Sequence, residues 1–345
     1  MYKLVHLLPK IRYKDRPQIH SAKLPILMKL ILAPMEGLTD PPMRRLLTEV
    51  GSYDWCVSEF IRITDQLLPA HVIYSYCPEL HNECQTDSGT PVHIQFLGND
   101  PIALADNAAF AVELGAPAID LNFGCPAKTV NRHRGGAVLL DEPEVIHEII
   151  ATVRKAVPKH IPVSAKMRLG YLDDARTLDN ARAIEAAGAA WLTIHARTKT
   201  DGYKPPAYWE KLPAVREAVS MPLIANGEIW TVEDAMRCQD VSGCIDLMLG
   251  RGAVTRPDLV NRIRGQHGID WTTLLKLQLD FLDSPTKTDA GLVGRYKQWL
   301  GMLTHGYVEA GELWTKVKKA KQLSDIRTEI AATLGIDRQV LSSIE

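Results

Sequence analysis

This 345-residue sequence lacks an excess of charge of either sign. Its 40 lysines and arginines are balanced by 41 acidic residues, which leaves a formal net charge of −1. Proteins that bind nucleic acid over much of their surface carry a marked positive excess. Contact with nucleic acid would therefore require local clusters of cations, and charge alone excludes no partner.

The sequence also contains no closely spaced cysteine pair of the CxxC kind. A chain of this length needs no disulfide framework, so we expect reduced thiols and a cytoplasmic protein. Cys77, His81 and Cys84 have a spacing that loosely resembles a metal site, but no second pair accompanies them and we expect no bound metal. The six cysteines are Cys56, Cys77, Cys84, Cys125, Cys238 and Cys244.

Long apolar stretches are absent as well. No uninterrupted run approaches the roughly 18 residues of a membrane span, so we expect a soluble protein without membrane contact. Residues 1–27 contain no run long enough for the core of a signal peptide. They are basic, with Asp15 as their one acidic residue, and we expect a poorly ordered extension. Met28 would make a natural start of translation, and the basic bias also fits an organelle transit peptide.

What the sequence does contain is an alternation of short apolar runs and helical patterns. Strand-like runs that are apolar throughout are typical of a parallel sheet buried on both faces. Eight such runs, separated mostly by helical patterns such as 101–114 and 174–187, predict an α/β fold, namely a TIM (β/α)8 barrel. The expected strands span residues 30–34, 55–58, 92–97, 118–123, 162–167, 191–196, 222–226 and 245–249.

After about residue 265 the strand pattern stops and helical patterns continue. Leucine-rich segments at 271–282, 291–303, 308–323 and 324–334 predict an all-α helical bundle that follows the barrel. We therefore divide the chain into an extension (1–27), a catalytic barrel (28–265) and a helical domain (266–345). Lys316, Lys318, Lys319 and Lys321 make the third expected helix of this bundle strongly basic.

Residues 121–136, with the sequence LNFGCPAKTVNRHRGG, combine a buried strand, a cysteine, several cations and paired glycines. They would lie at the carboxyl end of a barrel strand, the rim on which barrel enzymes carry their chemistry. We interpret the segment as an active-site loop in which Cys125 gives or takes a proton. Lys128, Arg132 and Arg134 would favour the thiolate and hold an anionic ligand nearby. A small core cysteine in a glycine turn is the alternative.

Polar residues also follow most of the other expected strands, where a barrel places its functional groups. Gln95 offers an amide that donates and accepts in one plane, and Lys166 and Arg168 present two cations on one side of their strand. Gly227 and Gly250, after the last two strands, are typical of a phosphate seat. A planar ring with a phosphate tail fits this set, so we expect flavin mononucleotide (FMN), with Lys166 beside the negative charge of the reduced ring. Because no GxGxxG motif is present, NAD(P)H should bind transiently as a substrate and should not be a permanently bound cofactor.

Six motifs, in this order, resemble those of the tRNA-dihydrouridine synthases: APMEG (33–37), LNFGCPAKTVNRHRGGAVLL (121–140), KMRLG (166–170), HARTK (195–199), ANGEI (225–229) and GRGA (250–253). The resemblance runs from about residue 28 to the end of the chain. It implies an FMN-loaded barrel and a helical bundle that clamp tRNA, with NADPH as the electron donor; we expect a monomer.

By the same resemblance, the reaction would be reduction of the C5–C6 double bond of a D-loop uridine to 5,6-dihydrouridine. Hydride would pass from the reduced flavin to C6, and Cys125 would deliver the proton to C5 as a general acid. That role needs a protonated thiol, whereas cationic neighbours favour the thiolate. The sequence leaves the protonation state of Cys125 open.

The resemblance also implies roles for individual residues. Asn122, Arg168 and Tyr203 resemble contacts to the uracil ring. The implied FMN-binding residues are Pro34, Met35, Glu36, Gln95, Lys166, His195, Asn226, Gly227, Glu228, Gly250 and Arg251.

Segments 59–69 and 294–300 most resemble the bacterial C-type synthases, which reduce uridine 16. This implies tRNA contacts by Arg62, Arg295, Lys297, Met302 and Lys318. On a helix Arg295 and Lys297 would point about 200° apart, so both can contact one RNA only if it wraps around that helix or its stems bend. A solvated helix face is the alternative for Lys297.

Three other functions fit parts of the pattern. A flavin-dependent barrel that reduces a small molecule, such as a dihydropyrimidine or an enone, would need no basic helical bundle. A flavin-free barrel of the aldolase type would use Lys166 as a Schiff-base amine and would be colourless when purified. A tRNA-binding or chaperone module with a vestigial barrel would not depend on Cys125. The set of residues at the strand ends and the basic segment 290–321 favour the synthase.

Overall fold

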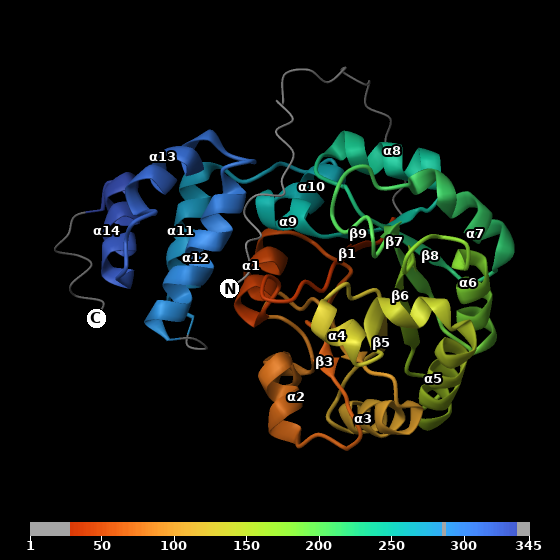
Figure 1. Cartoon of the computed structure of the whole chain (residues 1–345). Coiled ribbons are helices and arrows are strands. Elements are labelled where there is room, and N and C mark those ends of the chain that lie inside the picture. Colours follow the sequence, from red (N-terminus) through yellow and green to blue (C-terminus); the bar gives the residue numbers. More distant parts are fainter. Residues whose placement is uncertain (1–27, 285–287, 337–345) are drawn as a thin grey trace.

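The computed structural model of the protein describes residues 28–284 and 288–336. The expectations for residues 1–27 and for the chain beyond residue 336 therefore fall outside the described residues. Within them, eight parallel strands close into a barrel with helices around it (Figure 1). The strands are β1 (Leu30–Leu32), β2 (Trp55–Val57), β4 (Val92–Leu97), β5 (Ile119–Phe123), β6 (Val163–Gly170), β7 (Leu192–Thr198), β8 (Leu223–Asn226) and β9 (Asp246–Leu249).

The predicted TIM barrel is confirmed, and each of its eight strands overlaps the expected segment. The ring closes because β2 pairs with both β1 and β4, all in parallel. Two details differ from the expectation. A further short strand, β3 (Ile61–Arg62), pairs with the end of β4, and β6 continues to Gly170 instead of ending at residue 167. The longer β6 keeps Arg168 inside the sheet, where it pairs with His195 of β7.

Helices connect the strands along the outside of the barrel. Side chains cap two of these helices at their starts: at α3 the Asp100 side chain accepts from two backbone N–H groups, and at α8 Thr231 and Asp234 form a reciprocal capping box. The elements are α1 (Pro41–Val50), α2 (Ala70–Tyr76), η2 (Pro78–Asn82), α3 (Pro101–Glu113), α4 (Lys128–Arg132), η3 (Gly136–Asp141), α5 (Pro143–Ala156), α6 (Thr177–Ala186), η4 (Trp209–Lys211), α7 (Leu212–Ala218), α8 (Val232–Ser242), α9 (Arg251–Thr255) and α10 (Leu259–Ile263).

Aromatic rings fill the barrel interior near the amino ends of its strands. The ring of His93 stacks on Trp55 with centroids 5.1 Å apart and packs against Trp191 at 5.7 Å. Burial lowers the pKa of His93 to about 3, so this imidazole is neutral at physiological pH. The aromatic packing fills the barrel at the amino ends of its strands, whereas polar side chains lie toward the carboxyl ends.

All six cysteines lie in the described part of the chain, where they are buried and free of disulfide bonds. Cys77 Sγ lies 3.8 Å from Cys84 Sγ, while the ring of His81 stacks on Tyr74 instead of joining the two thiols. No group of three or more potential ligand side chains that could hold a metal ion occurs among the described residues. Over the same residues, none of the helices has both the length and the apolar character needed to cross a bilayer.

Four further helices follow the barrel, as predicted: α11 (Trp271–Leu282), α12 (Asp289–Leu303), α13 (Val308–Val317) and α14 (Leu323–Leu334). They pack beside α1 and α9 (Figure 1) and share one continuous hydrophobic core with the barrel. The indole of Trp299 donates to the Val254 carbonyl at 3.2 Å, and Arg256 donates to the Gly306 carbonyl at 2.7 Å. Apolar packing and hydrogen bonds therefore hold these helices against the barrel.

The basic segment lies differently from the expectation, because α13 ends at Val317. Lys318 is the residue that caps the helix, and Lys319 and Lys321 follow it in the connection to α14. All four lysines of the segment are exposed. They form a cluster at one end of α13, not a basic face along it.

Arg295 of α12, which was expected to contact tRNA, is buried where the helical region meets the barrel. Its side chain is 7% exposed and forms an ion pair with Asp40, with Nε 3.1 Å from Oδ2. It also donates to the Leu38 carbonyl at 2.6 Å. Asp40 caps the first helix of the barrel, so Arg295 joins the helical region to the turn after β1. Its guanidinium is committed to protein groups because the two parts meet there.

Removing this buried guanidinium should destabilise the protein. We expect Arg295→Met to lower the free energy of unfolding by about 3 kcal/mol, since the buried guanidinium and its bonds to Asp40 and to the Leu38 carbonyl would be lost. Urea unfolding followed by circular dichroism would measure the change. Lys318→Met, at an exposed position, is the control and should stay within about 0.5 kcal/mol of wild type. Equal stability of the two variants would show that the Arg295 ion pair contributes nothing to the docking of the helices.

Candidate active site

The loop after β5 holds Cys125 by hydrogen bonds on both sides. The Asn122 Oδ1 atom accepts from the backbone N–H groups of Gly124 and Cys125, each at 2.9 Å. The Cys125 carbonyl in turn accepts from the Asn131 side chain at 2.9 Å. Gly136 has a φ of +67°, and a Cβ there would lie 2.8 Å from the Cys125 carbonyl, which explains the glycine at this position. The backbone around the thiol is thus held in one arrangement.

The Cys125 thiol is protonated at neutral pH. It is 8% exposed and packs against Leu97 and Val130. Burial raises its pKa above the ordinary value of 9.0, as does the charge of Glu36, and together these outweigh the opposing effects of Lys166 and other groups. A buried thiol in this state can donate a proton.

The expectation that Lys128, Arg132 and Arg134 favour the thiolate is therefore wrong. All three side chains are exposed, and Arg134 pairs with Glu142 at 2.6 Å. They follow Cys125 in the sequence but turn to the outer surface, where solvent screens their charges. The cations that do lower the thiol pKa are Lys166 and Arg168, from the neighbouring strand.

Beneath the cysteine loop, a chain of hydrogen bonds runs through the barrel interior. Asn122 Nδ2 donates to Gln95 Oε1 at 2.8 Å, and Gln95 Nε2 donates to Asp120 Oδ2 at 2.6 Å. Ser164 also donates to Asp120, at 2.6 Å. Asp120 and Ser164 were not among the expected site residues. Their signal in the sequence is the period of two along the strands, which puts Asp120 on the same side as Asn122 and Ser164 on the same side as Lys166.

Lys166 is the buried cation at the centre of the site. Its Nζ atom is 3.3 Å from Asn226 Oδ1, which is its hydrogen-bond partner among the described residues. Asn226 donates its own N–H to the Met248 carbonyl at 2.8 Å, which orients the amide. Burial, reinforced by the charge of Arg168, lowers the pKa of Lys166 to about 8. An ammonium group with three N–H donors and one long hydrogen bond can accept a further anionic or carbonyl partner.

Arg168 connects two loops of the rim. Its Nε donates to the Gly124 carbonyl at 2.8 Å, and its Nη1 donates to the carbonyls of Thr198 at 3.0 Å and Gly202 at 2.9 Å. The guanidinium also lies over the ring of Tyr203, 5.2 Å from its centroid. Arg168 was expected at the uracil; in the structure it holds the cysteine loop against the loop that carries Tyr203.

His195 of β7 lies beside a second group of charges. Burial and nearby cations hold its pKa well below the usual range, so the imidazole is neutral. Its Nε2 is 3.2 Å from Nη1 of Arg197, a fully buried residue that pairs with Glu228 at 2.6 Å. Arg251 lies 3.6 Å from the other oxygen of Glu228. Arg197, missed among the expected site residues, therefore links the end of β7 to the turn after β8.

Two turns bring the backbone close to this group. Gly227 has a φ of +116°, and a Cβ there would lie 2.8 Å from the His195 ring. At Gly250, before α9, a side chain would meet the Met35 sulfur at 3.6 Å. Pro34, Met35 and Glu36 form the turn after β1, and burial together with the charge of Glu59 raises the pKa of Glu36.

The expected residues thus fall into two sets. Those assigned to the cofactor and the uracil come from successive strand ends of one barrel mouth. Tyr203, at 38% exposure, lies at its edge.

The residues assigned to tRNA are spread over separate surfaces. Arg62 is exposed on β3 and Lys318 is exposed at the end of α13. Lys297 donates to the Ala320 carbonyl, on the side of α12 away from Arg295, and Met302 packs against the core. The opposite directions of Arg295 and Lys297 agree with their helical spacing.

Known proteins resemble this chain over most of its length. The family model for dihydrouridine synthase (Dus) matches residues 31–278. A tRNA-dihydrouridine(16) synthase of Pseudomonas syringae pv. tomato is 53% identical over 300 residues, covering 85% of this chain and 95% of the relative. One of Haemophilus influenzae is 45% identical over 307 residues, covering 88% and 99%.

Among solved structures, a variant of NCR from Zymomonas mobilis superposes with a TM-score of 0.51 at 15% identity, covering 74% of this chain and 94% of that one. At this identity the likeness supports the barrel fold alone. The family model covers more than half of the chain and the relatives match most of it. The chain therefore belongs to the dihydrouridine synthase family.

Proposed function

We propose that the protein reduces the C5–C6 double bond of a D-loop uridine in tRNA, forming 5,6-dihydrouridine at position 16. Membership of the family and the names of its relatives support the reaction and the position. The single observation that carries the proposal is that Cys125, in the loop after β5, keeps its proton beside the buried cation Lys166 of the adjacent strand β6, whose charge acts on the thiol. One group can donate a proton to a carbon and the other can favour negative charge on a ring next to it.

The cofactor that fits this mouth is FMN, with NADPH as the electron donor. When bound, FMN would take electrons from NADPH and supply the hydride that adds to C6. The fit rests on the unfilled donor capacity of Lys166 and on the tight turn at Gly227, which packs against the His195 ring and leaves no room for a side chain there. The residues proposed to hold it are Pro34, Met35, Glu36, Gln95, Lys166, His195, Asn226, Gly227, Glu228, Gly250 and Arg251.

The protein's own contribution is to hold groups in place and to supply the proton. Cys125 would donate its proton to C5, with Asn122 fixing the loop through the backbone N–H groups. Lys166 would remain charged while buried, and neutral His195 would offer a ring nitrogen for hydrogen bonding without adding a charge. Tyr203, held by Arg168, would border the flipped uracil.

The lysine cluster at the end of α13 favours an RNA substrate over a small molecule. Lys316, Lys318, Lys319 and Lys321 are exposed and lie within six positions of one another. Phosphate contacts of this kind position an RNA and make binding dependent on salt. A reductase of a small enone or dihydropyrimidine would have no use for such a cluster.

The proposal predicts a specific product. Purified protein should be yellow, and with NADPH it should form dihydrouridine at position 16 of unmodified tRNA, as mapped by mass spectrometry of nuclease fragments. Cys125→Ala should retain the flavin spectrum and tRNA binding but lose turnover by roughly 10²–10⁴-fold, the usual effect of a general acid. Cys244→Ala, at a buried cysteine that precedes β9 and so lies at the opposite end of the barrel from the rim, is the matched control.

Three outcomes would contradict parts of this prediction. Unchanged turnover of Cys125→Ala would remove the role of the thiol as acid. Product at another uridine would leave the chemistry and reject the position. A yellow enzyme that forms no product in tRNA would favour a small-molecule reductase.

The pKa of Lys166 predicts a pH dependence. A pKa lowered to about 8 means that the ammonium is charged below this pH and loses its proton as the pH rises through it. We expect the rate at which NADPH bleaches the flavin to fall above about pH 8 in wild type. Lys166→Arg stays charged throughout, so its profile should be flat over this range even where its maximal rate is lower. The same fall in both proteins would assign the titration to another group.

The lysine cluster predicts a salt-dependent loss of binding. Lys318→Glu should weaken tRNA binding by roughly tenfold and flatten the dependence of log Kd on log salt, because a phosphate contact is lost. Lys155→Glu makes the same change of charge at an exposed position of α5 and should alter neither quantity. Filter binding at several salt concentrations would measure both. Equal effects of the two variants would exclude the end of α13 as a specific tRNA contact.

A further inference from the structure

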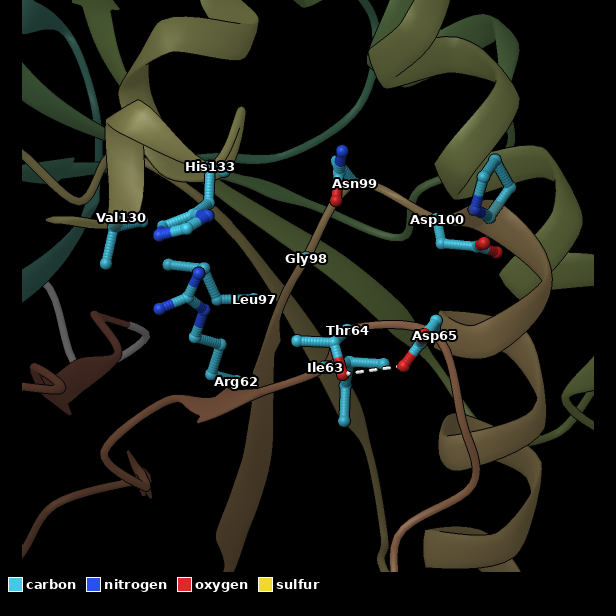
Figure 2. A pocket seen from close by; sticks show the side chains of 12 residues that line it. Arg62, Ile63, Thr64, Asp65, Leu97, Gly98, Asn99, Asp100, Val130 and His133 are labelled. Carbon is cyan, nitrogen blue, oxygen red and sulfur yellow. Dashed lines mark hydrogen bonds between the residues drawn. The ribbon is translucent and has the colours of Figure 1, made fainter.

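A cavity of about 440 Å³ opens beside the cysteine loop (Figure 2). It lies where three segments meet: the residues after β3, the turn between β4 and α3, and the end of α4. Leu97 and Val130 line it, and the same two side chains pack against Cys125. The cavity and the catalytic thiol are therefore separated by a single layer of side chains. Of the residues that line it, Arg62 alone was given a functional role above, as a tRNA contact, and the cavity itself has none.

The two ends of the cavity differ in charge. In Figure 2 Arg62 and His133 lie together at one end, and Asp65, Asn99 and Asp100 lie at the other. Among the described residues, the side chains of Arg62 and His133 have no hydrogen-bond or ion-pair partner. At the other end, Asp100 is occupied as the cap of α3, and Asp65 accepts from Thr64 at 3.1 Å. One end thus offers free donors to an anion, and the other offers acceptors to hydroxyl or amino groups.

We propose that this cavity binds one of the two nucleotides that flank the target uridine in the RNA strand. Its phosphate would contact Arg62 and His133, and its ribose hydroxyls or base amino group would face Asp65 and Asn99. The inference rests on the proposed function and extends it, because it assigns a place to a neighbour of the reacting base. The volume lies in the range of about 300–1,000 Å³ that is usual for pockets that bind small ligands.

Position and chemistry both support this occupant. Leu97 and Val130 pack against Cys125, so a nucleotide next to a uridine held at this thiol would lie beside the cavity that the two side chains line. A base can leave its stack only if the flanking backbone is splayed, and holding a neighbour in a separate pocket stabilises that form. RNA combines an anionic phosphate with a 2′-hydroxyl donor, which matches the two ends of the cavity.

The first test uses substitutions at the cationic end. Arg62→Gln should raise the KM for tRNA by roughly tenfold, since a charge-assisted hydrogen bond to phosphate is lost, and His133→Gln should also raise it, since the ring that borders the phosphate position is lost. The kcat should stay within about twofold. The slope of log KM against log salt should fall by about 0.7 for one lost contact to a single strand. Arg132→Gln, an exposed cation on α4 outside the cavity lining, is the control and should change none of these.

The second test locates the phosphate on the RNA. A series of tRNAs would carry one neutral methylphosphonate linkage each, at the positions around the target uridine. At one of these positions the neutral linkage should raise the KM of the wild-type enzyme as much as Arg62→Gln raises it on unmodified tRNA. The same linkage should not raise the KM of the Arg62→Gln variant any further. Additive effects at every position would overturn the proposal, as would a loss of kcat with unchanged KM.

The outcomes separate this inference from the proposed function. Wild-type protein that forms no dihydrouridine in tRNA would contradict the function, and the cavity proposal would fall with it. Active wild type with an Arg62→Gln variant that behaves like the Arg132→Gln control would leave the function standing and reject the cavity as a nucleotide site.

Discussion

The hydrogen-bond chain Asp120–Gln95–Asn122 is the constraint on which the arrangement of the site depends. Asn122 uses its oxygen for two backbone N–H groups of the cysteine loop and its nitrogen for Gln95. Rotating this amide would break all three bonds and leave part-buried polar groups without these partners. Side chains of the barrel interior therefore fix the position of the thiol, and these hydrogen bonds hold the loop rigidly against the sheet. Asp120 in turn is held by Ser164 from β6, so three adjacent strands contribute.

Burial rather than local charge decides the protonation states at this mouth. For both Cys125 and Lys166 the largest effect on the pKa is the loss of water, which favours the neutral form of each. The thiol keeps its proton despite two nearby cations. The lysine keeps its proton only up to about pH 8. A general acid needs the first property. The lowered pKa of Lys166 suits a cation that stabilises negative charge on a neighbouring ring. A weakly solvated ammonium gains more interaction energy from a new anionic partner than a fully solvated one does.

The sequence was sufficient to predict the barrel and most of the residues at its mouth. Parallel strands that are buried on both faces appear as apolar runs, and in a barrel their carboxyl ends lie on one rim. The sequence was insufficient wherever spatial neighbours differ from sequence neighbours. Arg132 precedes the paired glycines of the cysteine loop yet faces solvent, whereas Lys166 reaches Cys125 from 41 positions away. Arg295 shows the same limit, since a helical pattern cannot reveal that a polar residue meets Asp40, 255 positions earlier. The two-residue strand β3 was too short to produce a pattern.

The burial of Arg295 changes how a position-specific enzyme of this kind would select its uridine. If the exposed lysines at the end of α13 contact the RNA, their distance from the barrel mouth determines which nucleotide arrives at Cys125. That distance is set by the docking of α12 on the first turn of the barrel, where Arg295, Asp40 and the Leu38 carbonyl meet. A residue whose side chain is committed to protein groups can then influence the choice of nucleotide as strongly as one that binds phosphate. Selection would lie in the rigid geometry between two surfaces, because phosphate contacts fix orientation and carry no sequence information of their own.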